Sequence, residues 1–369
     1  MSFREAMLYE SLSGNRVLCN VCARRCVVAE GEVGFCKIRK NIGGKFFSLV
    51  YGLAALDFKD PIEKKGLFHF NPGSMTYSFG TMGCNFRCRF CINYYVTLSA
   101  KNIDGQLLPP REMVALAKQN DCEGISYTYN EPTVFFEYAY DTARLAHKVG
   151  FFNTFVTNGY MTPEAVHAIA PFLDAATVDF KGGGDPTFYR RLSGVPRVEP
   201  IFECLKSLKK HGIHVEVTNL IVEKYGGDSM EQIRSLAGWI RDNLGRETPL
   251  HFLRYRPQAP MVMSMPLPEV EEKAYEISRD EGLRYIYNRE HTNTYCLNCN
   301  ALLIERARNP VVQYVTDLKI NPDNTCPNCG KKATIVGQCN MSKEVCSCGG
   351  VGFPPSALGV STDYWGYEG

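Results

Sequence analysis

Short apolar stretches alternate with longer segments of helical periodicity between residues 75 and 255. The apolar stretches are rich in β-branched and aromatic residues, which favours strands, and several longer segments open with proline or a capping residue, which favours helices. The expected strands are residues 75–80, 124–127, 151–157, 175–180, 214–220 and 250–255, and the expected helices are residues 110–118, 134–148, 163–170, 200–211 and 229–243. This pattern predicts an α/β fold, a partial (β/α)6 barrel of the TIM type, with its chemistry at the strand ends.

The chain has 369 residues, of which 45% are hydrophobic, enough for one core of barrel size with smaller modules attached. We expect a cysteine-rich module in residues 1–70, the barrel in residues 71–288 and a second cysteine-rich module in residues 289–369. A net charge of +2 predicts no general attraction for nucleic acid or an anionic membrane. No apolar stretch is long enough to span a bilayer, so we expect a cytoplasmic protein without a transmembrane segment.

Cysteine is unusually frequent, with sixteen residues, and most of them fall into three groups. The groups are Cys19, Cys22, Cys26 and Cys36, then Cys84, Cys88 and Cys91, and finally Cys296, Cys299, Cys326 and Cys329. Clustered thiols in a reducing cytosol bind metal more often than they form disulfides. We therefore expect three metal centres, while Cys122 and Cys204 lie in helix-like patterns and are expected in the core.

The central group follows the first expected strand, after a glycine-containing turn. Structural zinc sites and closed clusters use four protein ligands, whereas three thiolates leave one iron of a [4Fe–4S] cluster open to another ligand. The alternative is a zinc site that a distant histidine, such as His69, completes. The number of cysteines therefore favours a cluster with one open position.

The spacing Cys-x3-Cys-x-aromatic-Cys, with Phe90 as the aromatic residue, resembles the signature of the radical S-adenosylmethionine (SAM) superfamily. Further along the chain the sequence resembles the pyruvate formate-lyase activating enzymes and, among them, the radical SAM enzymes of the AmmeMemoRadiSam system. The stretches that carry this resemblance are residues 18–26, 34–39, 60–65, 127–132, 156–159, 178–181 and 295–299, in the family's order. The resemblance implies a radical SAM barrel in which Cys84, Cys88 and Cys91 hold a [4Fe–4S] cluster. That cluster would reductively cleave SAM to a 5'-deoxyadenosyl radical.

The resemblance also implies which residues orient SAM. Asn130 and Glu131, which follow Tyr129, stand where the superfamily has Gly-Gly-Glu-Pro and are expected to face the methionyl ammonium group. Glu131 is alternatively an acid of the loop or of the following helix N-terminus. The cofactor contacts are therefore expected to begin at the end of the second strand.

Two further strand ends resemble the activating enzymes. Thr157 and Asn158 end the third expected strand, and Asp179 and Lys181 end the fourth, where the family contacts the ribose and carboxylate of SAM. Lys181 is expected to pair with the SAM carboxylate. The monovalent cation of similar enzymes lacks one ligand here, because Val156 replaces an aspartate. Asparagine and aspartate also serve as ordinary turn and loop-capping residues.

The two flanking groups differ in spacing. The N-terminal four cysteines occupy a segment too short to build a core, so a metal would supply its fold; an auxiliary [4Fe–4S] cluster is favoured, with zinc as the alternative. The two CxxC pairs of the C-terminal group predict a tetrahedral site for zinc or a single iron. Cys339, Cys346 and Cys348 follow and either bind a further cluster or have no ligand role.

Three functions are compatible with these features. The first is an anaerobic radical SAM oxidoreductase or transferase that takes hydrogen from a small molecule or lipid and receives electrons from a ferredoxin or flavodoxin. The second is an activating enzyme of a partner glycyl radical enzyme, and the third is a non-catalytic metal-binding scaffold. Modules at both ends of the barrel favour the first, because an activating enzyme must admit a peptide loop across an open barrel mouth.

Overall fold

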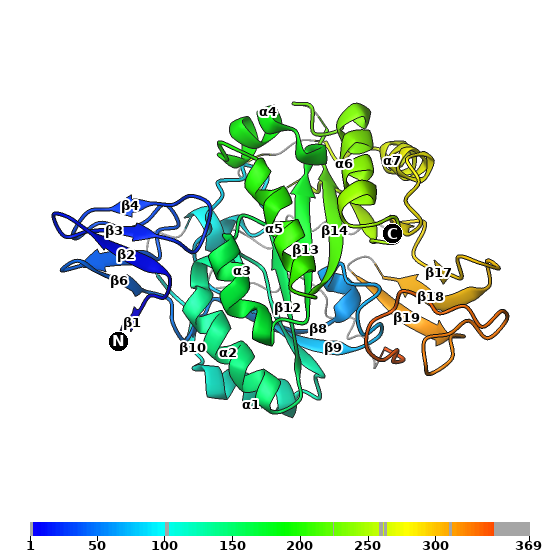
Figure 1. The fold of residues 1–369 in the computed structure, drawn as a ribbon, viewed down its shortest axis with the longest axis horizontal. Coiled ribbons are helices and arrows are strands. Elements are labelled where there is room, and N and C mark those ends of the chain that lie inside the picture. Colours follow the sequence, from blue (N-terminus) through cyan, green and yellow to red (C-terminus); the bar gives the residue numbers. More distant parts are fainter. Residues whose placement is uncertain are drawn as a thin grey trace, which may run out of the picture.

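The computed structural model describes residues 3–99, 103–223, 225–257, 261, 264–309 and 312–342. Its centre is an eight-stranded sheet of order β16-β15-β14-β13-β12-β11-β9-β8 (Figure 1). The strands are β8 (Leu56–Pro61), β9 (Met75–Gly80), β11 (Gly124–Tyr127), β12 (Phe152–Thr157), β13 (Ala175–Lys181), β14 (His214–Ile221), β15 (Leu250–Arg254) and β16 (Ile286–Tyr287). All neighbours are parallel except β8, which is antiparallel to β9. Since β8 and β16 are both edges, the sheet forms a partial barrel.

Helices follow the parallel strands and cover the outer face of the sheet (Figure 1). They are α1 (Pro110–Gln119), α2 (Phe136–Lys148), α3 (Pro163–Ile169), α4 (Pro186–Phe188), α5 (Glu199–Lys210), α6 (Met230–Asn243) and α7 (Pro268–Asp280). The side chains of Thr162 and Ser229 cap α3 and α6 by accepting backbone N–H groups. The six predicted strands and five predicted helices are confirmed, with ends that differ by at most two residues.

Among the strands of the central sheet and the α-helices that cover it, β8, β16, α4 and α7 are absent from the sequence prediction. β8 carries Asp57, Lys59 and Asp60 among its apolar residues, so it lacks the apolar run of a buried strand. It pairs along its whole length with β9. The sheet therefore begins before residue 71, where the sequence placed the start of the barrel.

The N-terminal module consists of two small antiparallel sheets beside the barrel (Figure 1). Their strands are β1 (Arg4–Glu5), β6 (Lys45–Ser48) and β5 (Arg39–Ile42), and β2 (Tyr9–Leu12), β3 (Arg16–Cys19) and β4 (Val27–Val28). A further pair, β7 (Leu53–Ala54) with β10 (Gln106–Leu107), follows the module. Arg39 and Glu137 are fully buried and form a bidentate ion pair, with N···O distances of 2.6 and 3.0 Å, that joins this module to α2.

The C-terminal module is a three-stranded antiparallel sheet of β17 (Thr294–Tyr295), β18 (Leu302–Arg308) and β19 (Gln313–Leu318). Its last described loop pairs with the segment before β9: Val336 N–H donates to the His69 carbonyl and Asn71 N–H to the Val336 carbonyl, both at 2.8 Å. This places the module near the end of the barrel where the strands begin. In Figure 1 the two cysteine-rich modules lie on opposite sides of the barrel. Among the described residues, no helix has the length and apolar character needed to cross a membrane.

Candidate functional site

The loop after β9 carries the central cysteines and begins where β9 and β11 approach closely. A Cβ atom on Gly80 would lie 2.3 Å from the backbone oxygen of Thr128, so only glycine fits there. Cys88 is buried, and Cys84 and Cys91 are half-buried at the level of whole residues. Burial raises the pKa of all three thiols, to about 12 for Cys88. Such thiols become thiolates only with a positive partner, as a bound iron cluster provides.

Asn130 fixes the backbone that leads into this loop. Its Oδ1 accepts the N–H of Thr81 at 3.1 Å, and its Nδ2 donates to the carbonyl groups of Met82 and Gly83, at 3.3 and 2.8 Å. One side chain thus holds the three residues that precede Cys84. The amide of Asn130 is used within the protein, so this side chain positions the cysteine loop.

Glu131 is buried and connects the ends of β11 and β12. Its Oε1 accepts from Thr133 N–H, from the Thr133 hydroxyl and, at 2.7 Å, from the Thr157 hydroxyl; its Oε2 accepts the N–H of Asn158 at 2.7 Å. Burial raises the pKa of Glu131, and these donors oppose that effect. The Asn158 amide also donates to Asn85 Oδ1 at 2.8 Å. The predicted SAM-binding strand ends therefore form one hydrogen-bonded unit with the cysteine loop.

Lys181 and Asp179 lie at the end of β13, next to the cysteines. Lys181 Nζ is 2.9 Å from Asp179 Oδ2, and only 11% of the lysine side chain is exposed. Burial alone would lower the pKa of Lys181, but Asp179 and Cys88 raise it above its usual value. The positive charge in turn favours the thiolates of Cys88 and Cys91. Asp179 Oδ1 is buried without a hydrogen-bond partner in the protein and is free to accept from a ligand.

Tyr129 and Phe90, the two aromatic residues predicted at the site, have different surroundings. The Tyr129 hydroxyl donates to Asp60 at 2.6 Å, its backbone has a positive φ of 67°, and its carbonyl accepts from Asn93 Nδ2. Phe90 is buried against Phe188, with the ring centroids 5.5 Å apart. Tyr129 thus joins the cysteine loop to β8, and Phe90 anchors the loop in the core.

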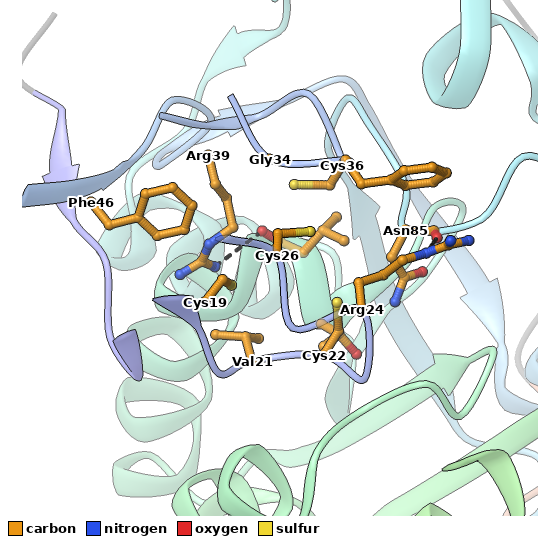
Figure 2. Close-up of a pocket in the computed structure, with 13 residues that line it drawn as sticks. Cys19, Val21, Cys22, Arg24, Cys26, Gly34, Cys36, Arg39, Phe46 and Asn85 are labelled. Carbon is orange, nitrogen blue, oxygen red and sulfur yellow. Dashed lines mark hydrogen bonds between the residues drawn. The ribbon is translucent and has the colours of Figure 1, made fainter. Parts of the chain in front are cut away.

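The N-terminal four cysteines surround a cavity of about 330 Å³, part of it open to solvent (Figure 2). It is also lined by Val21, Arg24, Gly34, Phe35, Arg39, Phe46, Asn85, Thr133 and Val134. Figure 2 shows the side chains of Cys22, Cys26 and Cys36 directed into this space. Burial raises the pKa of Cys36 to about 11 and that of Cys22 still further. The structure thus brings all four predicted ligands around one cavity.

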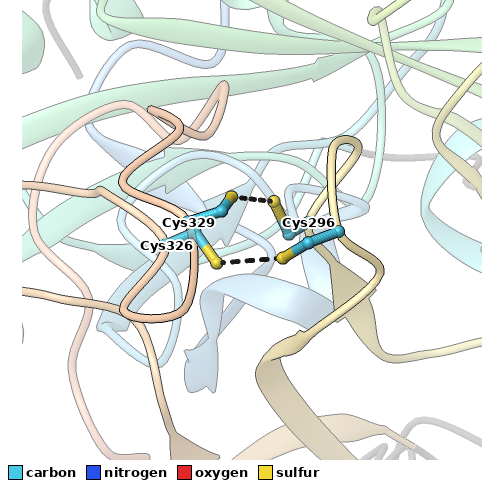
Figure 3. Close-up of side chains that lie close together, drawn as sticks. Cys296, Cys326 and Cys329 are labelled. Carbon is cyan, nitrogen blue, oxygen red and sulfur yellow. Dashed lines mark hydrogen bonds between the residues drawn. The ribbon is translucent and has the colours of Figure 1, made fainter.

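The C-terminal four cysteines converge more tightly, with their four sulfur atoms all within 4.8 Å of one another. The Sγ atoms of Cys296 and Cys329 are 3.6 Å apart, as are those of Cys299 and Cys326 (Figure 3). Four sulfurs at 2.3 Å from one tetrahedral ion would be about 3.8 Å apart. A hydrogen bond from the Asn298 side chain lowers the pKa of Cys329 to about 6, which favours its thiolate. These four residues fit a single metal ion.

Of the three remaining predicted thiols, Cys339 is the one among the described residues, and it lies outside this group. Cys339 is half-buried, and its Sγ lies 3.6 Å from Asn324 Oδ1, outside the four converging sulfurs. Cys346 and Cys348 lie outside the described residues. A further cluster at these three cysteines therefore stays a prediction.

A family description matches the part of the chain that holds the central site. The sequence model of the radical SAM superfamily matches residues 79–239, from the end of β9 to α6. The chain belongs to this superfamily. The radical SAM chain is 43% identical over 344 residues to the uncharacterized protein MJ0808 of Methanocaldococcus jannaschii, covering 90% of this chain and 99% of the relative. It is 25% identical over 286 residues to MJ0674 of the same organism, covering 73% of this chain and 77% of that protein.

The solved structures that this chain resembles share little sequence with it. A domain of pyruvate-formate lyase-activating enzyme from Bacteroides vulgatus is 18% identical, with 44% of this chain and 98% of that domain covered and a TM-score of 0.38. SuiB of Streptococcus suis, bound to S-adenosylmethionine, is 17% identical, with 57% and 48% covered and a TM-score of 0.45. The narrower resemblance to the AmmeMemoRadiSam enzymes is not tested by these similarities and stays a prediction.

The residues of the central loop fit the superfamily's cofactors. Cys84, Cys88 and Cys91 supply three thiols and no fourth protein ligand is needed, because the open iron takes SAM. The buried ammonium of Lys181 and the unpartnered Oδ1 of Asp179 stand at the same strand end and suit the polar groups of SAM. A [4Fe–4S] cluster and SAM are therefore the cofactors that this site is built for.

Asn85, Arg87, Arg39 and Asp60 are site residues that the sequence pattern does not predict. Asn85 and Arg87 lie inside the central cysteine motif, yet their types carry no ligand signal, and only the fold shows what they contact. Arg39 and Asp60 lie in stretches that carry the family resemblance, and Arg39 follows the fourth cysteine of the N-terminal group by three residues.

Proposed function

We propose that this protein is a radical SAM enzyme that cleaves SAM reductively at a [4Fe–4S] cluster on Cys84, Cys88 and Cys91. It uses the resulting radical to take hydrogen from a small molecule or lipid. The observation that carries the proposal is the position of these three thiols beside Lys181 and Asp179 at the carboxyl ends of the barrel strands, where parallel barrels hold their active sites. The bound cluster supplies the electron that splits SAM.

The protein's own residues bind and orient the cofactor. Lys181 carries a buried positive charge for the SAM carboxylate, and Asp179 offers a free acceptor to a hydroxyl or ammonium group. Asn130 holds the start of the cysteine loop, and Glu131 locks the Thr157 strand end against it. Groups that hold the reactants in the reactive geometry lower the entropic part of the activation barrier.

The N-terminal module supports a small substrate over the peptide loop of a glycyl radical enzyme. It covers one side of the cysteine loop, where Arg24 donates to the carbonyls of Asn85 and Gly194. A peptide loop would need this approach to be open. An electron spin resonance signal of a glycyl radical on a partner protein, formed with SAM and this protein, would instead establish the activating role.

The test is formation of 5'-deoxyadenosine from SAM by anaerobically reconstituted, dithionite-reduced protein. We expect turnover in the wild type and none above background in Cys84→Ala, with Cys122→Ala as a matched control that keeps all three cysteine groups. Retained cleavage in Cys84→Ala would exclude the assigned cluster ligands. A wild type that contains its full iron and binds SAM without cleaving it would favour the non-catalytic scaffold.

A further inference from the structure

The two groups of four cysteines differ in how closely their sulfur atoms approach. In the C-terminal group all four sulfurs lie within 4.8 Å of one another, and among the described residues this is the one group that meets that limit. The N-terminal sulfurs do not, although Cys19, Cys22, Cys26 and Cys36 line one cavity. The central cysteines, which hold a [4Fe–4S] cluster in this superfamily, do not meet the limit either.

Cluster size explains this difference. One tetrahedral ion draws its four sulfurs to within about 4 Å of one another. A [4Fe–4S] cluster binds each thiolate through a different iron, so its ligands stand farther apart and enclose a larger volume. The spaced thiols around the N-terminal cavity match the second geometry.

Two buried hydrogen-bond donors without partners line the same cavity. Asn85 is fully buried and its Nδ2 has no acceptor, although its Oδ1 accepts from Asn158. Arg39 is 2% exposed, and its Nε is unpartnered while its other two nitrogens bind Glu137. A buried donor without a partner is costly, because it has lost its hydrogen bonds to water and gained none in return. The sulfur atoms of an anionic cluster are the acceptors that such donors commonly meet.

The cavity is also joined to the loop of the central cysteines. Asn85 lines the cavity and follows Cys84 directly in the chain. Arg87, from the same loop, donates to the carbonyls of Phe35 and Cys84, and its guanidinium lies 4.2 Å from the Phe35 ring centroid. The positive charge of Arg87 interacts electrostatically with the sulfur atoms of both Cys84 and Cys36. Asn85 of the central loop thus lines the N-terminal site, and Arg87 of the same loop contacts Phe35, another residue of its lining.

We propose that Cys19, Cys22, Cys26 and Cys36 hold a second [4Fe–4S] cluster, which passes electrons to the cluster at Cys84, Cys88 and Cys91. With four protein ligands the second cluster has no open iron for SAM, so its chemistry is electron transfer. A ferredoxin- or flavodoxin-type donor gives it one electron, and that electron moves on to the central cluster. The second cluster returns to its oxidised state, and no bond is made or broken there. This role rests on the proposed function.

Metal content tests the site without reference to activity. Anaerobically reconstituted wild type should contain about eight irons and eight sulfides per chain, and a Cys84→Ala, Cys88→Ala, Cys91→Ala triple variant should keep about four of each. Replacing Cys19, Cys22, Cys26 and Cys36 by alanine in the triple variant should remove the remaining iron, whereas adding Cys122→Ala should not. Wild type with about four irons and a zinc ion that is lost when these four cysteines are replaced would overturn the cluster. The wild-type iron value decides the question even if a variant fails to fold.

Electron spin resonance tests the relay. Fully reduced wild type should show a spectrum broadened by interaction between two spins. The triple variant, and a variant in which Cys19, Cys22, Cys26 and Cys36 are all alanine, should each show a single unbroadened cluster signal. Wild-type spectra that equal the sum of the two single-cluster spectra would overturn direct transfer. Failure of SAM cleavage with both clusters and their interaction present would count against the proposed function alone.

Discussion

The backbone oxygen of Cys36 lies so close to Gly83 that a Cβ atom on residue 83 would stand 2.6 Å from it. Gly83 also has a φ of +83°, which side chains rarely adopt. Residue 83 precedes the first central cysteine, and Cys36 is the last cysteine of the N-terminal group. The absence of a side chain at one position therefore permits the close approach of two metal-binding segments.

Replacing this glycine should separate the two segments. We expect Gly83→Ala to lower the free energy of unfolding by about 2 kcal/mol, from backbone strain and overlap with Cys36 and Ile38. Gly31→Ala is the matched control, because Gly31 has a similar φ of +79° with nothing within 4 Å of the added Cβ, and should cost about 1 kcal/mol or less. Denaturant unfolding of both variants gives the comparison, and equal losses would contradict a close contact at Gly83.

Removal of the buried positive charge should weaken SAM binding. We expect Lys181→Met to raise the SAM dissociation constant about tenfold or more, the effect of losing one hydrogen bond to a charged group. Equilibrium binding to the reconstituted protein measures it. Lys206→Met, at a lysine that pairs with Glu203 on the surface of α5, should leave binding unchanged. Unchanged affinity in Lys181→Met would remove this residue from the SAM site.

The C-terminal metal should stabilise the fold without taking part in catalysis. Its module contacts the segment before β9, near the strand ends opposite the cysteine loop. We expect Cys326→Ala to lose one metal ion and several kcal/mol of unfolding free energy, because metal binding folds such knuckles. The folded fraction should retain the wild-type rate of SAM cleavage. Cys339→Ala should keep the metal ion and the wild-type unfolding free energy. If Cys339→Ala loses as much metal and stability as Cys326→Ala, Cys339 is a ligand.

Low pH should lower the stability of the protein through His69, which lies where the C-terminal module contacts the segment before β9. Burial lowers the pKa of His69 to about 3, and its ring contacts Tyr287 at 2.7 Å and Thr334 at 3.2 Å. The unfolded chain takes up this proton near pH 6.5 whereas the folded protein does not, so stability present above pH 6.5 is lost as the pH falls.

Between about pH 7.5 and 5.5 the wild type should lose about 1 kcal/mol more than His69→Gln. Denaturant titrations at both pH values give the difference. His147→Gln, at an exposed histidine of α2, should follow the wild type. Parallel losses in His69→Gln and wild type would mean that His69 is protonated in the fold.

Much of the barrel was predictable because its strands and helices carry strong local patterns. The strands from β9 to β15 are mostly buried and rich in β-branched and aromatic residues, and several of their helices have clear starts at proline or a capping residue. β8 escaped prediction because its polar residues pair with partners distant in sequence: the Asp57 carboxylate accepts the Tyr77 hydroxyl, and the Asp60 carboxylate accepts the Tyr129 hydroxyl. Local periodicity cannot show such pairing.

The sequence by itself determined the three cysteine groups, the superfamily signature and the order of strands and helices, because each depends on residues close together in the chain. Only the tertiary structure decided which groups these side chains bind: Asn130 donates to the backbone that leads into the cysteine loop, and Glu131 accepts from the end of the neighbouring strand. It also decided that Asn85 and Arg39 bring unpartnered donors to the N-terminal cysteines. Such contacts join residues far apart in the chain, and a buried donor acquires its partner only when the fold has excluded water.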